Sequence, residues 1–202
     1  MIARRPFTEA SPPAPYFYRY GKDMKYDEHE IERLYQENLS AARKLLASLP
    51  VAEGREPTTK GLNGWVYEQT IRHCLCQELK ELRIAPTIEV QVPLHGRTKV
   101  DLVVGGKVAI EIKALGIFGN DARKYSGYRA KAEENGWSYF YLTRGESYRP
   151  YRVSMRSTFG DERAFFLDIE GDWERFVGEI IRNLKQGHNN SLHRIAKKTG
   201  AR

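Results

Sequence analysis

Cysteine is scarce in this chain of 202 residues, which contains only Cys74 and Cys76. One closely spaced pair supplies neither the four ligands of a structural zinc site nor the framework of a disulfide-rich scaffold. The two cysteines lie two positions apart in a segment that we expect to be helical, so they face different ways, and we interpret them as reduced packing residues. The five histidines, His73 among them, show no metal-ligand spacing either.

Long hydrophobic runs are missing as well. No apolar run approaches the ~20 residues that a membrane-spanning helix needs. The N-terminal Met-Ile-Ala-Arg-Arg-Pro lacks the apolar stretch of a secretory signal. The length suits one domain with a sizeable core plus extensions, so we expect a cytoplasmic protein without membrane contacts.

Acidic residues are absent from one end of the chain and nearly absent from the other. Residues 1–22 hold four basic side chains and one acid, and residues 186–202 hold four basic side chains and no acid. The two ends therefore account for the whole formal net charge of +7, and residues 23–185 are neutral. We expect an extended basic arm over residues 1–22, a single domain over 23–185 and a mobile basic tail over 186–202.

The most informative segment is residues 101–113, which read Asp-Leu-Val-Val-Gly-Gly-Lys-Val-Ala-Ile-Glu-Ile-Lys. β-Branched residues on either side of a Gly-Gly turn signal predict two short strands that form a hairpin. Side chains alternate along a strand, so Glu111 and Lys113 share one face and the apolar Val108, Ile110 and Ile112 take the other. We expect the apolar face to be the core face, and Glu111 and Lys113 to point toward a cleft or solvent.

The length of the turn decides whether Asp101 meets Glu111. A two-residue turn pairs Asp101 with Ile110 and places it on the face opposite Glu111. A three-residue loop or a bulge sets Asp101 beside Glu111, with Cβ atoms about 5 Å apart. Two carboxylates that close repel unless a cation or a proton lies between them. A site for a hard divalent cation at this hairpin therefore requires an odd-numbered or bulged loop.

An Asp followed, on the adjacent strand, by Glu-x-Lys resembles the signature of the PD-(D/E)xK nuclease superfamily, whose members have the restriction-endonuclease-like fold. Asp101, Glu111 and Lys113 carry this resemblance, and Val100 stands where the family's name has proline. A second Glu-x-Lys triplet at residues 78–80 lies in an expected helix and has no Asp hairpin before it, so its context rejects it.

The helix before the hairpin adds a second motif. Gly64-Trp-Val-Tyr-Glu68 resembles the family's Gly-x-x-x-Glu element. In the family this Glu commonly ligates a second metal or accepts a hydrogen bond from the site. The alternative for Glu68 is a salt bridge to Arg72, one turn further along the helix.

The resemblance covers roughly residues 61–145 and implies an α/β fold, in which helices flank a mixed central β-sheet. The family's core is a helix, three antiparallel strands, a helix and a further strand. The matching segments are Leu62–Leu82, Thr87–Leu94, Thr98–Val104, Lys107–Ala114, Asp121–Asn135 and Trp137–Thr143. Outside this core we predict a first helix capped by Asp27, two more strands at Tyr151–Ser157 and Ala164–Ile169, and a last helix capped by Asp172.

The resemblance also implies a chemistry. Asp101, Glu111 and the backbone carbonyl of Ile112 would hold one Mg²⁺, for which Mn²⁺ substitutes. The cation would activate a water molecule for attack on a phosphodiester bond. Lys113 would position that water or stabilise the developing negative charge, and Glu68 would assist from the helix.

A basic stretch interleaved with tyrosines follows the Glu-x-Lys triplet and predicts contacts with phosphates. The candidate DNA-binding residues are Arg123, Lys124, Arg129, Lys131, Arg144, Arg149 and Arg152. For any single one of them, a solvated surface is the ordinary alternative.

The function that we expect is cleavage of double-stranded DNA by a type II restriction-like endonuclease. Double-strand cleavage by a chain with one site usually implies a two-fold dimer, so we expect a homodimer. The alternatives are a junction-resolving or repair nuclease of the same fold, and a catalytically silent DNA-binding subunit.

Overall fold

The computed structural model describes residues 24–48, 61–115, 121–145 and 149–199, so the basic arm predicted for residues 1–22 lies outside the described residues. None of the described helices is both long and apolar enough to cross a membrane. Both cysteines are free thiols. Cys74 is buried as predicted, whereas Cys76 is exposed and takes no part in the core.

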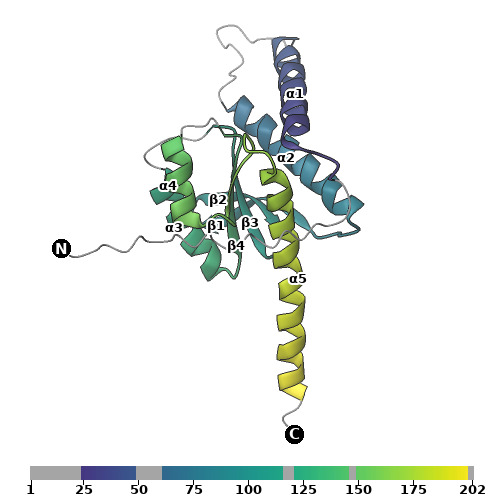
Figure 1. Ribbon diagram of the computed structural model, residues 1–202, viewed down its shortest axis with the longest axis vertical. Helices are drawn as coiled ribbons and strands as arrows, with labels where there is room; N and C mark the ends of the chain where they lie inside the picture. The colour runs from purple at the N-terminus through teal and green to yellow at the C-terminus, as the bar shows by residue number, and fades with distance from the viewer. Residues whose placement is uncertain (1–23, 49–60, 116–120, 146–148, 200–202) are drawn as a thin grey trace, which may run out of the picture.

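A five-stranded mixed β-sheet forms the centre of the molecule, and helices cover both of its faces (Figure 1). The first three strands form an antiparallel meander, and the last two continue the sheet parallel to the third. The strands are β1 (Ile88–His95), β2 (Thr98–Val104), β3 (Val108–Lys113), β4 (Ser138–Thr143) and β5 (Ala164–Phe166). The predicted α/β fold with a mixed sheet flanked by helices is confirmed.

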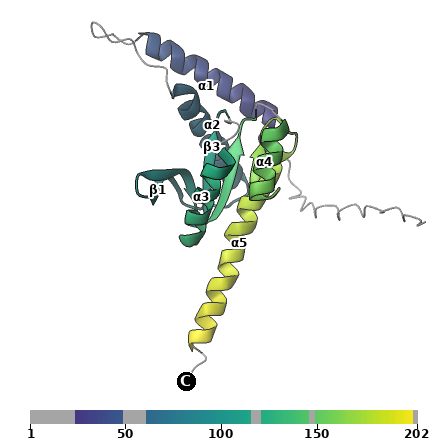
Figure 2. The ribbon, with the colours of Figure 1, turned by 90° about the vertical axis from the view of Figure 1, so that its left-hand side faces the viewer.

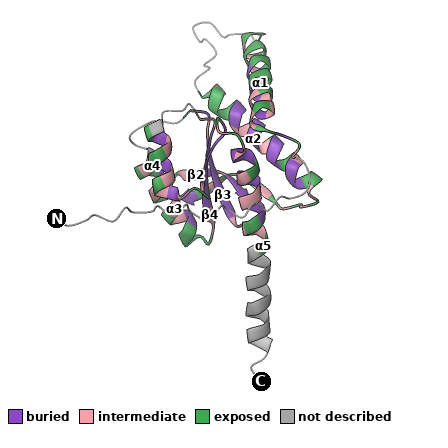
Figure 3. Ribbon diagram, viewed as in Figure 1, coloured by how far each residue is buried: buried purple, intermediate pink, exposed green. Residues whose placement is uncertain are grey.

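The helices divide between the two faces of the sheet. They are α1 (Glu28–Ser48), α2 (Leu62–Glu81), α3 (Asp121–Glu134), α4 (Arg149–Phe159) and α5 (Asp172–Thr199). Buried side chains of α1, α2 and α5 pack against one face, and those of α3 and α4 pack against the other. Buried residues accordingly concentrate on the strands and on the sides of the helices that face them (Figure 3). From α2 to β4, the observed bounds agree with the predicted ones to within one residue.

Strand β3 is covered on both sides, because each face of the sheet carries its own hydrophobic core. Val108, Ile110 and Ile112 pack in the core shared with α1, α2 and α5, as expected. Ala109, on the opposite face, packs in the core shared with α3 and α4. The expectation that this second face opens to a cleft or solvent is therefore wrong for Glu111, which is buried.

The β2–β3 hairpin turns through a three-residue loop, Gly105-Gly106-Lys107. Val104 pairs with Val108 and Leu102 with Ile110, so continuing this register by one residue places Asp101 opposite Glu111. The predicted odd-numbered loop is confirmed. The first glycine of the loop has φ +59°, a left-handed conformation that favours glycine, and a Cβ atom there would come within 2.5 Å of a Leu184 methyl carbon on α5, which would have to shift.

Helix α4 occupies the segment predicted as the strand Tyr151–Ser157, and that prediction is wrong. Tyr151, Met155 and Phe159 recur every four residues, and all three are buried against the sheet, which is helical spacing. Pro150 lies in the first turn, where its missing N–H costs nothing. The next predicted strand, Ala164–Ile169, is present but ends early, at Phe166.

The two predicted helix caps turn out differently. Asp27 caps α1 as predicted, since its carboxylate accepts a hydrogen bond of 2.7 Å from the Glu30 N–H. Asp172 begins α5, but its carboxylate accepts the Phe166 N–H at 2.8 Å and ties the helix to β5.

The basic tail predicted from residue 186 begins within α5, and its mobility stays a prediction. The backbone of α5 continues as a helix through Thr199. This part of α5 extends away from the sheet and the other helices (Figure 2).

Candidate functional site

Three of the predicted site residues meet where β2 and β3 lie side by side. The Lys113 Nζ atom lies 2.5 Å from Glu111 Oε1 and 3.7 Å from Asp101 Oδ2. One ammonium group therefore neutralises part of the charge of two carboxylates. The three-residue loop makes this contact geometrically accessible, because it sets Asp101 and Glu111 opposite each other.

The Asp101 carboxylate is oriented by hydrogen bonds to both of its oxygens. The backbone N–H of Ile112 donates to Oδ2 at 2.7 Å, and the Gln91 side-chain amide donates to Oδ1 at 3.2 Å. The N–H of Ile112 thus has a defined place at the site. The predicted role of the Ile112 carbonyl as a metal ligand stays a prediction.

Glu68 reaches the site from α2 through Gln91. The Gln91 amide nitrogen lies 3.2 Å from each Glu68 carboxylate oxygen as well as 3.2 Å from Asp101 Oδ1. Among the described residues Glu68 forms no salt bridge with Arg72, so that alternative is not realised. Sequence reasoning missed Gln91. No local signal marks it, because only the register of the assembled β1–β2 pair places Gln91 across from Asp101.

Glu111 is the most deeply buried charged group at the site, with 4% of its surface exposed. Its Oε2 atom has no hydrogen-bond partner among the described residues. Burial and the neighbouring Asp101 charge raise the pKa of Glu111 to about 7, although Lys113 acts in the opposite direction. Burial and Asp101 likewise raise the pKa of Glu68.

Lys113 stays protonated although its side chain is partly buried. Burial acts to lower its pKa, but the carboxylates of Glu111 and Asp101 outweigh burial and raise the pKa above its ordinary value. Its ammonium also lies 5.6 Å from the centre of the Tyr125 ring, within the range of a cation–π interaction. Lys113 is therefore protonated at neutral pH.

The residues present fit a hard divalent cation. A buried carboxylate oxygen without a partner is rare in folded proteins, and it is a ligand of the type that Mg²⁺ prefers. Glu111 Oε2 is such an atom, and Asp101 supplies a second carboxylate beside it. The described residues contain no group of three or more acidic, histidine or cysteine side chains arranged around one metal position. Mg²⁺ would therefore need water or backbone oxygens to complete its coordination.

Of the predicted DNA-binding residues, Lys124 lies close enough to the site for its charge to act on Glu111. Its Nζ atom is 4.8 Å from the centre of the Tyr125 ring and 5.5 Å from that of Tyr128. The side chain is exposed, and its charge acts to lower the pKa of Glu111. Arg123, its neighbour on α3, is also exposed.

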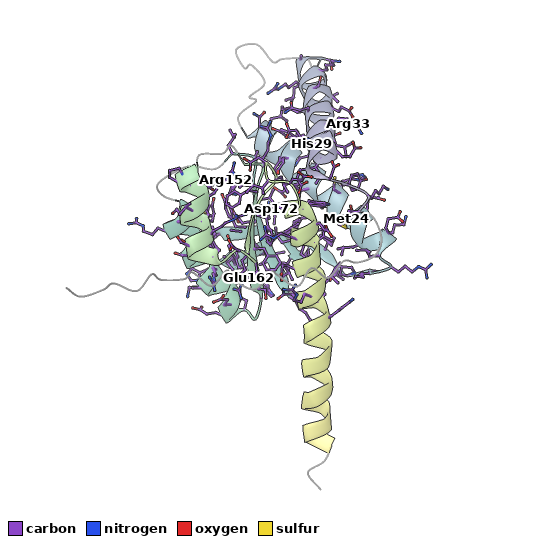
Figure 4. All side chains as sticks on the ribbon, viewed as in Figure 1. Met24, His29, Arg33, Arg152, Glu162 and Asp172 are labelled. Atoms are coloured by element: carbon purple, nitrogen blue, oxygen red, sulfur yellow. The ribbon has the colours of Figure 1, made fainter. Side chains whose placement is uncertain are left out.

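The other predicted DNA-binding residues are mostly paired with carboxylates. The pairs are Arg129–Glu133, Lys131–Glu134, Arg144–Glu32 and Arg152–Asp168. Figure 4 places Arg152 on α4, and the side chain of Arg149 lies outside the described residues. The seven residues therefore do not form one unpaired basic surface, and their contact with DNA stays a prediction.

A second buried carboxylate, Asp172, lies at the start of α5, in the interior of the molecule (Figure 4). Its Oδ2 atom accepts the Phe166 N–H at 2.8 Å and lies 3.3 Å from Arg156 Nη2, and its Oδ1 atom pairs with Arg175. Burial raises its pKa, although these three partners act to lower it. Both oxygens have partners, so this cluster joins β5, α4 and α5 and leaves no free ligand atom.

Comparisons with known proteins identify no relative of this chain. No protein-family model, curated protein or solved structure matches the chain. The chemistry of Glu68, Gln91, Asp101, Glu111 and Lys113 is therefore the basis for a functional assignment.

Proposed function

We propose that this protein is a Mg²⁺-dependent endonuclease of the PD-(D/E)xK type, which hydrolyses phosphodiester bonds in double-stranded DNA. The observation that carries the proposal is the meeting of Asp101, Glu111 and Lys113, with one buried Glu111 oxygen left without a partner. The succession α2, β1, β2, β3, α3, β4 is also the order of a restriction-endonuclease-like core, which supports the same assignment.

Asp101 and Glu111 are the residues that would hold the cation, together with the Ile112 carbonyl and water. When bound, Mg²⁺ supplies a Lewis acid that lowers the pKa of a water molecule and offsets charge on the phosphate. Ile112 N–H and Gln91 hold the Asp101 carboxylate in one orientation, which reduces the rearrangement needed to receive a ligand.

Lys113 acts in this scheme as an electrostatic group and not as a base. Its pKa is raised by Glu111 and Asp101, so it carries a positive charge at neutral pH. A charged ammonium stabilises negative charge that develops on the attacked phosphate, whereas only a neutral amine accepts a proton. A protonated lysine can fill either role expected from the sequence, because its N–H groups can also hold the attacking water in place.

The test is nicking of supercoiled plasmid DNA with Mg²⁺, with Mn²⁺ and with a chelator. We expect metal-dependent nicking by the wild-type protein and a loss of at least about 100-fold in Lys113→Ala, the order of magnitude for removing one charge-stabilising donor. Lys44→Ala is the matched control, because that lysine is exposed on α1 and belongs neither to the site nor to the predicted DNA-binding residues. DNA that stays intact with either metal would show that the proposal is wrong.

The products of the same reaction separate the nuclease classes. Discrete fragments from mixed genomic DNA indicate a type II restriction-like enzyme, which is the form that we propose, and we propose that it acts as a homodimer. Cleavage confined to branched or damaged substrates indicates a resolving or repair nuclease. Metal-independent DNA binding without cleavage indicates a silent DNA-binding subunit.

A further inference from the structure

Gln91 combines an unusual backbone conformation with contacts to two carboxylates of the candidate site. Its φ is +51°, and among the described residues only Arg83 is another non-glycine residue with positive φ. A side chain in this left-handed region costs about 1–2 kcal/mol, because Cβ approaches the following carbonyl oxygen. Such an outlier persists only where the surrounding structure compensates for it.

The left-handed residue coincides with a break in the regular pleat of the β1–β2 pair. Val90 pairs with Leu102 and Val92 with Val100, so Gln91 faces Asp101 between two regular pairs. On β2, Val100 and Val103 pack in the same core although they are three positions apart, an odd number, so the alternation of faces is interrupted around Asp101. The irregular backbone therefore lies at the point where the two strands present Gln91 and Asp101 to Glu68.

The Gln91 amide is suited to hold two carboxylates without neutralising them. An amide nitrogen has two N–H groups, and this one lies 3.2 Å from both Glu68 oxygens and from Asp101 Oδ1. A lysine or arginine at the same place would add a positive charge that repels an incoming cation. A neutral donor orients the carboxylates and leaves their negative charge available.

Resting on the proposed function, we propose that Gln91 is a positioning residue for the metal-dependent site. Its carboxamide links Glu68 on α2 to Asp101 on β2, holds the two carboxylates at a fixed separation, and turns Asp101 toward a cation shared with Glu111. Gln91 touches neither DNA nor the reacting water, and it acts only through the two carboxylates.

The experiment compares Gln91→Ala with Gln91→Gly. Both substitutions remove the amide, but only glycine also relieves the left-handed backbone. Mn²⁺ binding is measured by isothermal titration calorimetry, nicking by plasmid assay, and stability by urea denaturation. We expect both variants to bind Mn²⁺ about 10–100-fold more weakly and to nick more slowly at limiting metal, which is the usual effect of removing a partner that orients a metal ligand. We also expect Gln91→Gly to be at least as stable as Gln91→Ala, and saturating Mn²⁺ to restore part of the nicking rate.

Three outcomes would overturn the inference. Wild-type Mn²⁺ affinity and nicking in Gln91→Ala would show that the amide has no role at the site. Loss in Gln91→Ala that is recovered in Gln91→Gly would show that only the backbone matters. A wild-type protein that neither binds Mn²⁺ nor nicks DNA would overturn the proposed function together with the inference, whereas the first two outcomes leave the proposed function intact.

Discussion

Glu111 and Asp172 are two buried carboxylates that lie beside positively charged side chains, but they differ in whether both of their oxygens have a partner. Asp172, 1% exposed, has partners on both oxygens: the Phe166 N–H, Arg156 and Arg175. Glu111, 4% exposed, has Lys113 on one oxygen and no partner on the other among the described residues.

The difference separates a carboxylate that stabilises the fold from one that is available to a ligand. Satisfying both oxygens of a buried carboxylate recovers the solvation that it loses on folding. Leaving one oxygen without a partner costs stability, and such groups are retained where they serve another purpose. We therefore assign Asp172 to the fold and Glu111 to the site, and the predictions below test that division.

The largest effect is expected on catalysis. Glu111→Ala removes a proposed metal ligand, so we expect the nicking rate to fall by at least about 1,000-fold, equivalent to roughly 4 kcal/mol in the activation barrier. Asp172→Asn is the control. Its rate per folded molecule, corrected for the folded fraction by circular dichroism, should stay within a few-fold of wild type. Similar losses in both variants would remove the distinction between the two carboxylates.

The second prediction concerns stability. Asp172→Asn leaves Arg156, Arg175 and the Phe166 N–H with an amide in place of a charged acceptor, and breaking a buried ion pair costs about 3 kcal/mol. Urea denaturation measures the loss as a lower midpoint with an unchanged slope. Glu111→Gln in the metal-free protein should be neutral or stabilising, because it removes the repulsion between Glu111 and Asp101. A large loss in Glu111→Gln and none in Asp172→Asn would reverse our assignment.

The third prediction is a pH dependence of the metal-free protein. The pKa of Glu111 is raised from its ordinary value of 4.5 to about 7, so between these values the folded chain binds a proton that the unfolded chain has released. Stability contributed by this group is therefore present at low pH and is lost as pH rises from about 4.5 to about 7, by on the order of 3 kcal/mol. The difference between wild type and Glu111→Gln isolates this contribution, because other groups titrate in both proteins. Saturating Mg²⁺ should abolish the loss, since metal binding favours the ionised carboxylate. Parallel stability curves for the two proteins would contradict the prediction.

The smallest effect is expected at Glu133, which also contacts two arginines. Glu133 lies near Arg129 and Arg163, but 45% of its side chain is exposed. Exposed ion pairs contribute less than about 1 kcal/mol each because water screens them. We therefore expect Glu133→Ala to cost less than about 1 kcal/mol in the same denaturation experiment, and 0.5 M salt to reduce that cost further. A loss of stability as large as that of Asp172→Asn would mean that the number of arginine partners, and not burial, decides how much a carboxylate contributes to stability.

Local patterns were enough to predict much of this structure. The alternation of apolar residues and the glycines predicted β2 and β3, and the requirement that Asp101 meet Glu111 predicted an odd-numbered loop. The strands and helices from α2 to β4 were predicted as the segments that match the core of the family that the motif resembles, which has the same order of elements. The chemical identity of Asp101, Glu111 and Lys113 was likewise visible in the sequence.

The predictions that were wrong or missing concern residues whose burial or conformation depends on distant parts of the chain. Glu111 is buried because Tyr139 and Tyr141 of β4 help to build a second core on its face of the sheet. Gln91 joins the site because of a backbone angle that only the assembled β1–β2 pair imposes. The segment that forms α4 contains aromatic and β-branched residues typical of strands, and the four-residue spacing of its buried side chains was the stronger signal.

The three-residue loop between β2 and β3 imposes a counting rule on variation in this protein. Removing or inserting one residue there would shift the pairing of β2 with β3 by one position and place Asp101 and Glu111 on opposite faces of the sheet. A change of two residues would keep both side chains on the same face. Helix α5 restricts the tolerated loop lengths further. Leu184 of α5 lies against Gly105, and the Leu184 carbonyl accepts a hydrogen bond from the Lys107 side chain. Length variants that retain the site should therefore differ by even numbers of residues, and a library of loop lengths would display function at every second member.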